Sequence, residues 1–224
     1  MSNLDRESLM TRNLFIDCGG YDGCSVVQFL NERPEFDVVS FEPNPNFHKY
    51  YRFLPTQLIP KAVTTHDGTV ELRIDPVDGN GSSIVPAKNV VNNRQLENEE
   101  CPAIQVPAID LSRYIRDVSA TTSYLVLKLD VEGAEYEILP RLIEDGTIDL
   151  VDELLIEFHW DKCGVSKSVH EQLRRDVERR TPVTEWDAEG IATYRRSRRR
   201  KIRRELAVLS LWVKRFAAIH IKGR

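Results

Sequence analysis

Short apolar runs separated by amphipathic stretches make up about the first 160 residues of the chain. A strand that is covered on both faces reads as a continuous apolar run of about four to eight residues, so each run predicts a buried strand. The clearest run is Tyr-Leu-Val-Leu-Lys-Leu at residues 124–129. The predicted strands are residues 13–18, 36–41, 57–59 continuing towards 62–63, 69–74, 124–129 and 153–158.

Amphipathic segments between these runs predict helices at residues 25–32, 109–118, 132–143 and 169–180, with a short aromatic helix at 47–53 that Pro55 ends. Strands joined by helical crossovers indicate the α/β class, with a mainly parallel, Rossmann-like sheet and helices on both faces. Residues 182–187 and 191–195, separated by Ala-Glu-Gly, predict a closing antiparallel hairpin. The polar stretch 75–102 predicts a long functional loop.

The composition is that of a globular domain with a real core: 41% of the 224 residues are hydrophobic and 29% are charged. Four cysteines are scattered without a Cys-x-x-Cys pair, which favours free thiols over a zinc cluster or a disulfide framework. The polar start of the chain predicts no secretion signal, and the apolar stretches 14–18 and 206–213 are too short to span a bilayer. We therefore expect a cytoplasmic protein.

The net charge of −4 hides a strong asymmetry. Residues 195–224 hold twelve Lys or Arg and one Glu, whereas the other 194 residues hold 19 basic and 34 acidic side chains. We predict a catalytic domain at 1–194 and a basic, partly amphipathic extension at 195–224. The extension has three open roles: a final helix packed on the acidic body, a peripheral contact with anionic membrane, or a grip on nucleic-acid phosphates.

A glycine-rich turn follows the first predicted strand, in the sequence Asp-Cys-Gly-Gly-Tyr-Asp-Gly at residues 17–23. Ligands of open α/β sheets bind at the carboxyl ends of the strands. The dinucleotide pattern G-x-G-x-x-G fails because Tyr21 and Cys24 stand at glycine positions, which leaves Asp17, Gly19 and Gly23. Such a turn alone is as often structural as ligand-binding.

The second predicted strand ends in Phe-Glu-Pro-Asn-Pro and places Glu42 at its tip, 19 residues after Gly23. An acidic side chain at this position accepts hydrogen bonds from ribose hydroxyls. The alternative is a surface glutamate before a helix. The joint spacing of turn and acid favours a nucleoside-containing cofactor.

Four motifs resemble the FkbM family of S-adenosylmethionine (SAM)-dependent methyltransferases: the 17–23 turn, Phe-Glu-Pro-Asn-Pro, Lys-Leu-Asp-Val-Glu-Gly-Ala-Glu at 128–135 and Ile-Glu-Phe-His at 156–159. The similarity covers about residues 13–160. It implies a class I methyltransferase fold and O-methylation of a hydroxyl on a sugar, glycan or natural product. By position it implies a SAM site made of Asp17, Gly19 and Gly23 at the methionine part, Glu42 with Asn44 at the ribose, and Ala62 and Val63 near the adenine.

Candidate catalytic side chains lie at the ends of the last two long strands. Lys128 and Asp130 share one face by the two-residue period of a strand, and Glu157 and His159 do the same. We expect Asp130 to act as the base or to orient the acceptor hydroxyl, and His159 is a second candidate base because its charge changes near neutral pH. Glu135 lies at the start of the following helix, where its charge suits the helix dipole.

Two further sites are hypotheses at this stage. Asp130, Glu132, Glu157 and His159 offer the oxygen and imidazole ligands of a Mg²⁺ or Mn²⁺ site, and we keep metal dependence as an alternative that we do not favour. Residues 79–84, Gly-Asn-Gly-Ser-Ser-Ile, either line the substrate rim or form an ordinary polar loop.

Two other functions compete with O-methylation of a small acceptor. Lys128, Asp130 and Glu157 are similar to the sets used by RNA ribose 2′-O-methyltransferases, but the acidic body lacks an aromatic platform for RNA. A non-catalytic Rossmann domain that binds partners through its basic tail is the other rival, and the intact motif residues argue against such degeneration.

Overall fold

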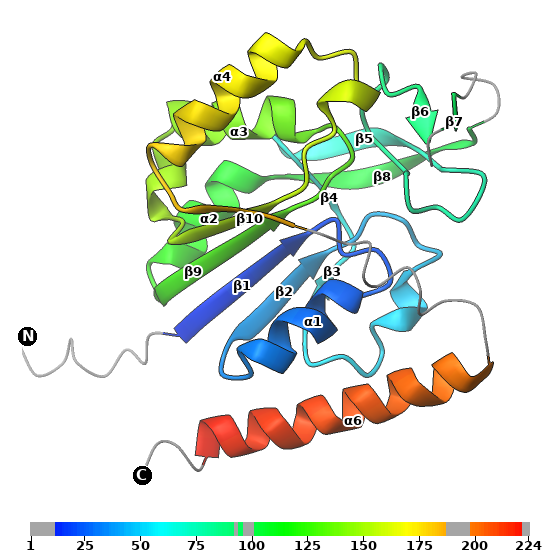
Figure 1. The fold of residues 1–224 in the computed structure, drawn as a ribbon, viewed down its shortest axis with the longest axis vertical. Coiled ribbons are helices and arrows are strands. Elements are labelled where there is room, and N and C mark those ends of the chain that lie inside the picture. Colours follow the sequence, from blue (N-terminus) through cyan, green and yellow to red (C-terminus); the bar gives the residue numbers. More distant parts are fainter. Residues whose placement is uncertain (1–11, 92–93, 96–100, 187–197, 221–224) are drawn as a thin grey trace, which may run out of the picture.

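A computed structural model describes residues 12–91, 94–95, 101–186 and 198–220. Its central feature is a six-stranded sheet in which every neighbouring pair of strands is parallel (Figure 1). The strand order is β11 (Val183–Glu185), β10 (Glu153–Ile156), β9 (Thr122–Leu129), β1 (Arg12–Cys18), β2 (Asp37–Phe41) and β3 (Gln57–Ile59). The predicted α/β, Rossmann-like architecture is therefore confirmed.

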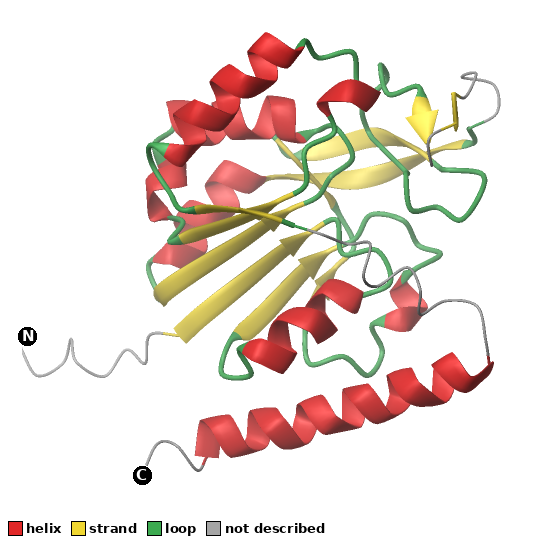
Figure 2. Cartoon of the chain, viewed as in Figure 1, coloured by secondary structure: helices red, strands yellow, loops and turns green. Residues whose placement is uncertain are grey.

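Helices cover both faces of this sheet, as Figure 2 shows. On one face lie α2 (Leu111–Ser119), α3 (Glu135–Glu144) and α4 (Lys167–Glu178), and on the other lie α1 (Cys24–Glu32) and α6 (Arg198–His220). The short 3₁₀ segments are η2 (His48–Tyr50), η4 (Thr147–Leu150) and η5 (Trp160–Lys162).

The alternation of side chains along β1 explains why the sheet needs two layers of helices. Leu14 and Ile16 pack in one core with Ile115 of α2, whereas Phe15 points to the opposite face and stacks on Phe29 of α1 with ring centroids 3.8 Å apart. All of these side chains are at most 5% exposed. A strand that is apolar on both faces is stable only when both faces are covered.

A second, three-stranded sheet extends from the edge near β3. It consists of β4 (Ala62–Thr64), β8 (Ala103–Asp110) and β5 (Gly68–Arg73), with β4 parallel and β5 antiparallel to β8. A two-stranded ribbon, β6 (Val90–Val91) and β7 (Arg94–Gln95), lies within the stretch expected to be a loop.

The prediction of one strand from residue 57 to 63 is wrong, because Pro60 separates β3 from β4 and cannot donate to a strand ladder. Strand β8 was missed altogether. Its sequence carries Pro107 opposite Thr69, and a proline within a run argues against a strand. The helix predicted from residue 109 starts instead at Leu111, after Asp110 caps it by accepting from Arg113 N.

Two other helix predictions need correction. The helix predicted from residue 132 begins at Glu135, because Glu132 and Gly133 have left-handed φ angles of 56° and 110°. The aromatic helix predicted at 47–53 is only the 3₁₀ turn η2, in a segment confined by Pro45 and Pro55.

The first half of the predicted closing hairpin, residues 182–187, contains strand β11. Strand β11 pairs in parallel with β10, with Leu154 opposite Val183 and Ile156 opposite Glu185. Helix α4 provides the crossover connection that this parallel pair needs. The second half of the predicted hairpin, residues 191–195, and the predicted boundary at 194 lie outside the described residues.

The C-terminal segment forms the 23-residue helix α6, which packs against α1 (Figure 1). This agrees with one of its three expected roles, a final helix packed on the body. Leu211 is fully buried in the core that contains Phe29. The guanidinium of Arg215 donates to the Pro34 and Phe36 carbonyls and lies 3.1 Å from Asp37 Oδ1. No helix within the described ranges has the length and apolarity that crossing a lipid bilayer would need.

The packing of α6 can be tested by two matched substitutions in the same helix. Leu211→Ala removes a fully buried side chain and should lower the free energy of unfolding by about 2–5 kcal/mol. Leu209→Ala, at a side chain that is 62% exposed, should change it by no more than about 0.5 kcal/mol. Urea denaturation measures both. Equal effects would mean that α6 does not pack on α1.

Candidate active site

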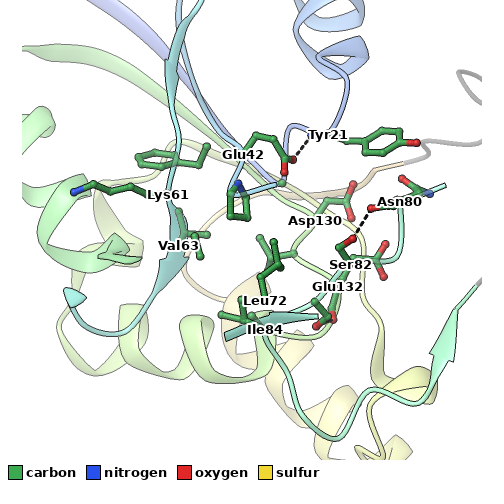
Figure 3. A pocket seen from close by; sticks show the side chains of 18 residues that line it. Tyr21, Glu42, Lys61, Val63, Leu72, Asn80, Ser82, Ile84, Asp130 and Glu132 are labelled. Carbon is green, nitrogen blue, oxygen red and sulfur yellow. Dashed lines mark hydrogen bonds between the residues drawn. The ribbon is translucent and has the colours of Figure 1, made fainter. Parts of the chain in front are cut away.

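A pocket lies beyond the carboxyl ends of β1, β2 and β9, with an empty volume of about 630 Å³ (Figure 3). This volume includes space that is open to solvent. Among the residues predicted from the sequence, its walls contain Gly19, Glu42, Ala62, Val63, Asp130 and Glu132. Among the residues not predicted, they contain Tyr21, Lys61 and Leu72.

Glu42 is fixed at the inner wall of this pocket. Its Oε2 accepts from Tyr21 N and its Oε1 from Asn44 N, both at 2.6 Å. The residue is 5% exposed, and burial raises the pKa of Glu42 to about 8 although the two backbone donors lower it. A desolvated carboxylate in a fixed orientation is well suited to bind hydroxyl donors.

Asn44 does not line the pocket. It is buried, its Oδ1 accepts from Asn46 N, and its Nδ2 has no hydrogen-bond partner in the part of the chain that the structure describes. In this arrangement Asn44 contributes its backbone N–H, which donates to Glu42 and orients that side chain.

Asp17 and Lys128 lie behind the pocket wall. Asp17 is fully buried, and its Oδ2 accepts from Ser25 Oγ at 2.7 Å and Ser40 Oγ at 3.1 Å. The Lys128 ammonium is 3.2 Å from Asp17 Oδ1 and donates to Gly19 O at 3.0 Å. Both side chains therefore hold the glycine turn from behind.

Lys128 also joins this turn to Asp130, whose Oδ2 is 3.3 Å from Lys128 Nζ. Burial alone would lower the pKa of Lys128, but the charges of Asp130 and Asp17 outweigh it and raise the pKa. Lys128 thus remains a buried cation that positions Asp130 rather than a base.

Gly19 permits the closest backbone approach in the site. A Cβ at this position would lie 1.7 Å from the carbonyl oxygen of Asp130, and the residue has a φ of +78°. Gly23 has a different role: it caps α1 and leaves no room for a Cβ beside Leu54. Gly23 does not line the pocket.

Asp130 faces the pocket from the end of β9. Burial raises the pKa of Asp130 to about 6, with Glu132 and Glu157 adding to the effect and Lys128 opposing it. The group therefore changes its protonation state close to neutral pH, where a catalytic carboxylate is most useful.

His159 lies at the centre of an acidic cluster just beyond β10. The residue is fully buried, and its Nδ1 lies 3.0 Å from Glu135 Oε1, which also accepts from the His159 backbone N–H at 2.7 Å. Its Nε2 is 3.4 Å from Glu157 Oε1 and 3.5 Å from Glu132 Oε2. Burial lowers the pKa of His159, but Glu135, Glu157 and Glu132 together raise it to about 10. As an imidazolium His159 is not a base.

Glu157 lies one residue beyond the end of β10, so the shared strand face predicted for Glu157 and His159 does not exist. The interaction with His159, whose Nε2 lies 3.4 Å from Glu157 Oε1, is the main cause that holds the pKa of Glu157 below its usual value. Glu157 and His159 do not line the pocket, although they adjoin the Asp130 and Glu132 side chains that do.

The similarity of the chain to known protein families identifies the family in which this site occurs. The family model described as "Methyltransferase FkbM domain" matches residues 17–180, which contain every side chain described around the pocket. The chain belongs to the FkbM methyltransferase family.

A curated relative named "Methyltransferase 1", from Beauveria bassiana (strain ARSEF 2860), is 25% identical over 162 residues. That match covers 65% of this chain and 64% of the relative, so the chain spans less than two thirds of that protein's length. No solved structure matches the chain.

The loop predicted as a substrate rim forms one wall of the FkbM pocket, through Gly79, Asn80 and residues 82–84. It is tied to the loop after β9 because Ser83 Oγ donates to Glu132 O at 2.7 Å. The buried Lys88 forms an ion pair with Glu132 and donates to Gly81 O at 2.7 Å.

The structural roles of Lys88 and Glu135 were not predicted from the sequence. Lys88 lies in a polar stretch where nothing distinguishes it from a surface lysine. Glu135 lies at a helix N-terminus, where an exposed negative charge would suit the helix dipole. It is instead fully buried beside His159. The one available signal was its place within the 128–135 motif of the FkbM domain.

The contact between Gly19 and Asp130 predicts a sharp difference between two glycines of positive φ. Gly164 has a φ of +70° but open space where a Cβ would lie, so Gly164→Ala should cost only the backbone strain of about 1–2 kcal/mol. Gly19→Ala adds a collision with backbone and should cost about 3 kcal/mol or more. Thermal unfolding of both variants measures the difference, and equal losses would contradict the close approach.

Proposed function

We propose that this FkbM-family protein is a SAM-dependent O-methyltransferase whose acceptor is a hydroxyl of a sugar, glycan or natural product. The observation that carries the proposal is the pairing of two carboxylates on one pocket: the oriented, desolvated Glu42 and the near-neutral Asp130. Family membership supplies the methyl-transfer class.

The residues around the pocket fit SAM. Glu42 would bind the ribose hydroxyls, since both of its oxygens are already oriented by backbone donors. Ala62, Val63 and Leu72 supply an apolar wall for the adenine. The turn at Gly19, which admits no side chain, would lie against the methionine part, with Asp17 and Gly23 shaping that turn from behind. Bound SAM supplies an electrophilic methyl group on a sulfonium.

On the acceptor side, the chain offers groups that bind and deprotonate a hydroxyl. Asp130 accepts the hydroxyl proton, because its raised pKa makes it a stronger base than an ordinary aspartate. Asn80 and Ser82 add polar contacts in the facing wall (Figure 3). A wall rich in hydrogen-bonding groups suits an acceptor with several hydroxyls.

The RNA 2′-O-methyltransferase alternative gains no support from the site. It needs a lysine at the acceptor, whereas Lys128 is 1% exposed and paired with Asp17 and Asp130.

Calorimetric titration with SAM and with S-adenosylhomocysteine tests the cofactor and the role of Glu42. Both ligands should bind the wild-type protein, and Glu42→Ala should weaken them roughly 10- to 100-fold, as expected for lost hydrogen bonds to a carboxylate. Ribose donors stabilise the ionised carboxylate, so binding should lower the pKa of Glu42 from about 8 and release protons at pH 7.

Repeating the titration in buffers of different ionisation enthalpy counts those protons, and Glu42→Gln should release none at this site. A folded wild-type protein that binds neither ligand would overturn the proposal. Binding that Glu42→Ala leaves unchanged would remove Glu42 from the ribose site.

A further inference from the structure

The His159 ring is held in the way that proteins hold an imidazole ligand of a metal ion. Its Nδ1 lies against the buried carboxylate of Glu135, and its side chain is 1% exposed. Its Nε2 is buried and makes no hydrogen bond of good geometry with any described residue. A carboxylate on one ring nitrogen that directs the other nitrogen outward is the usual outer support of a metal-binding histidine.

Carboxylate oxygens surround this Nε2 at distances that suit a shared ion better than direct hydrogen bonds. Glu157 Oε1, Glu132 Oε2 and Asp130 Oδ1 lie 3.4, 3.5 and 3.9 Å away. Hydrogen bonds between such atoms are about 2.7–3.2 Å long. Ligands placed about 2.1 Å from one ion are separated by about 3–4 Å. Ligand atoms of Asp130, Glu132 and His159 all lie within 4.8 Å of one another.

The charge of the cluster also favours a cation. Five carboxylates meet here, and the only ammonium groups that the described residues pair with them are Lys88 and Lys128. The carboxylates belong to Asp17, Asp130, Glu132, Glu135 and Glu157. Negative charge remains in excess whether or not His159 carries a proton, so a divalent ion would be attracted in either state. An ion bound at Nε2 would displace the Nε2 proton of the imidazolium to solvent.

We infer that Asp130, Glu132 and His159 bind a divalent cation of the Mn²⁺ or Mg²⁺ class, with Glu157 as a further ligand. Three oxygens and one imidazole nitrogen form a mainly hard ligand set that suits these ions. Glu135 is a positioning residue, since it orients the His159 ring and does not reach the ion. Lys88 supports Glu132 in the same manner.

The site gives the ion a place in the reaction if the proposed methyltransferase function holds. Asp130 and Glu132 line the pocket, whereas His159 and Glu157 lie behind them, so an ion held by these four residues would be reached from the pocket. A hydroxyl bound to the ion loses its proton to solvent more readily, because the ion stabilises the oxygen anion. Asp130 would then serve as a ligand of the ion. The ion, rather than the Asp130 carboxylate alone, would activate the acceptor hydroxyl.

Titration of the full chain with Mn²⁺ alone, followed by the electron paramagnetic resonance signal of the free ion, tests this inference without SAM or acceptor. The wild-type protein should remove one equivalent of Mn²⁺ from solution. Glu157→Gln should weaken binding at least about 10-fold, and His159→Gln at least about 100-fold. Glu144→Gln, an exposed carboxylate of α3, is the matched control and should bind as the wild type does.

Circular dichroism shows which variants are folded, and Glu157→Gln keeps the test valid if the buried His159 variant is not, because the Glu157 side chain is 36% exposed. Glu135→Gln should weaken Mn²⁺ binding roughly 10- to 100-fold. A wild-type protein that leaves millimolar Mn²⁺ free, or a folded His159→Gln that binds as tightly, would overturn the site. Failure to bind SAM alone would count against the proposed function and leave the Mn²⁺ result intact.

A separate observation concerns the outer side of α6. Opposite the buried Leu211, this helix presents Leu206, Leu209, Val213 and Phe216, each 61–64% exposed. Their spacing of three and four residues places them in one stripe along the helix. An apolar stripe on the solvent side of a packed helix has no role in folding.

Next to α6, the body presents exposed aromatic and basic groups. Trp212 Nε1 donates to Phe53 O at 3.0 Å, and the Phe53 ring is 69% exposed. The Arg52 guanidinium lies 5.2 Å from the centre of that ring. The chain that leads into and begins α6 has eight basic residues among the ten from 195 to 204.

We propose that this face docks on an anionic lipid surface, with the apolar stripe in the headgroup boundary. The twelve Lys and Arg residues of 195–224 give this segment a positive charge that anionic lipid would attract. Exposed leucine and phenylalanine beside dense arginine are typical of helices that lie in a membrane interface. A nucleic-acid site would use the basic run and leave the apolar stripe in water. The positive charge of the segment and the exposed apolar side chains of α6 therefore both favour binding to a membrane over binding to nucleic acid.

Co-sedimentation with vesicles of phosphatidylcholine, with and without phosphatidylglycerol, tests the membrane contact. Binding should require the anionic lipid and fall at least about 10-fold between 50 and 500 mM salt. Leu209→Ser with Phe216→Ser should reduce it at least about 10-fold, whereas Leu150→Ser, an exposed leucine of the body, should not. No binding at low salt would overturn the proposal, as would a dimer by light scattering that the double variant dissociates without any vesicle binding.

Discussion

The buried ammonium of Lys128 links the two strands on which the site is built. Strands β1 and β9 are neighbours at the centre of the sheet, with Asp17 opposite Lys128 in their register. The ammonium pairs with Asp17 on one strand and with Asp130 on its own, and it also bonds the carbonyl of Gly19. Burying these charges is costly, and their attraction repays that cost only when the geometry is good. The glycine turn and Asp130 are therefore held in one arrangement.

From this centre the two halves of the site divide between neighbouring strand ends. The β1 and β2 ends carry the glycine turn and Glu42, and the β9 and β10 ends carry the acidic cluster around His159. The loop at 79–84 closes the pocket over both, since Ser83 and Lys88 fasten it to Glu132. The groups that we propose to bind the cofactor and the acceptor thus lie together at the carboxyl ends of one parallel sheet, where open α/β sheets bind their ligands.

Helix α6 shows how one segment can serve the core and the surface at once. Its inner side completes the apolar layer around Phe29, which α1 covers only in part. Its outer side remains apolar although nothing in the described chain covers it. The basic extension of the sequence therefore includes a separate element, the helix α6, which packs on α1 on one side of the sheet (Figure 1).

The sequence by itself determined the α/β class, the strands of the main sheet, and the residues at their tips. Continuous apolar runs identify strands that are buried on both faces, and motif spacing places Gly19, Glu42 and Asp130 at strand ends. These properties depend on local patterns. Strand β8 was not predicted, because Pro107 interrupts the local strand pattern. The strand is stabilised instead by its long-range pairing with β5.

Only the tertiary structure decided which polar side chains face the pocket and which lie behind it. Asp17, Lys128 and His159 are indistinguishable by spacing from residues that touch a ligand, yet all three are buried beneath the wall. The direction of β11 and the two apolar sides of α6 depend in the same way on distant segments. Burial and charge pairing arise from what packs against a residue, and a linear pattern does not contain that information.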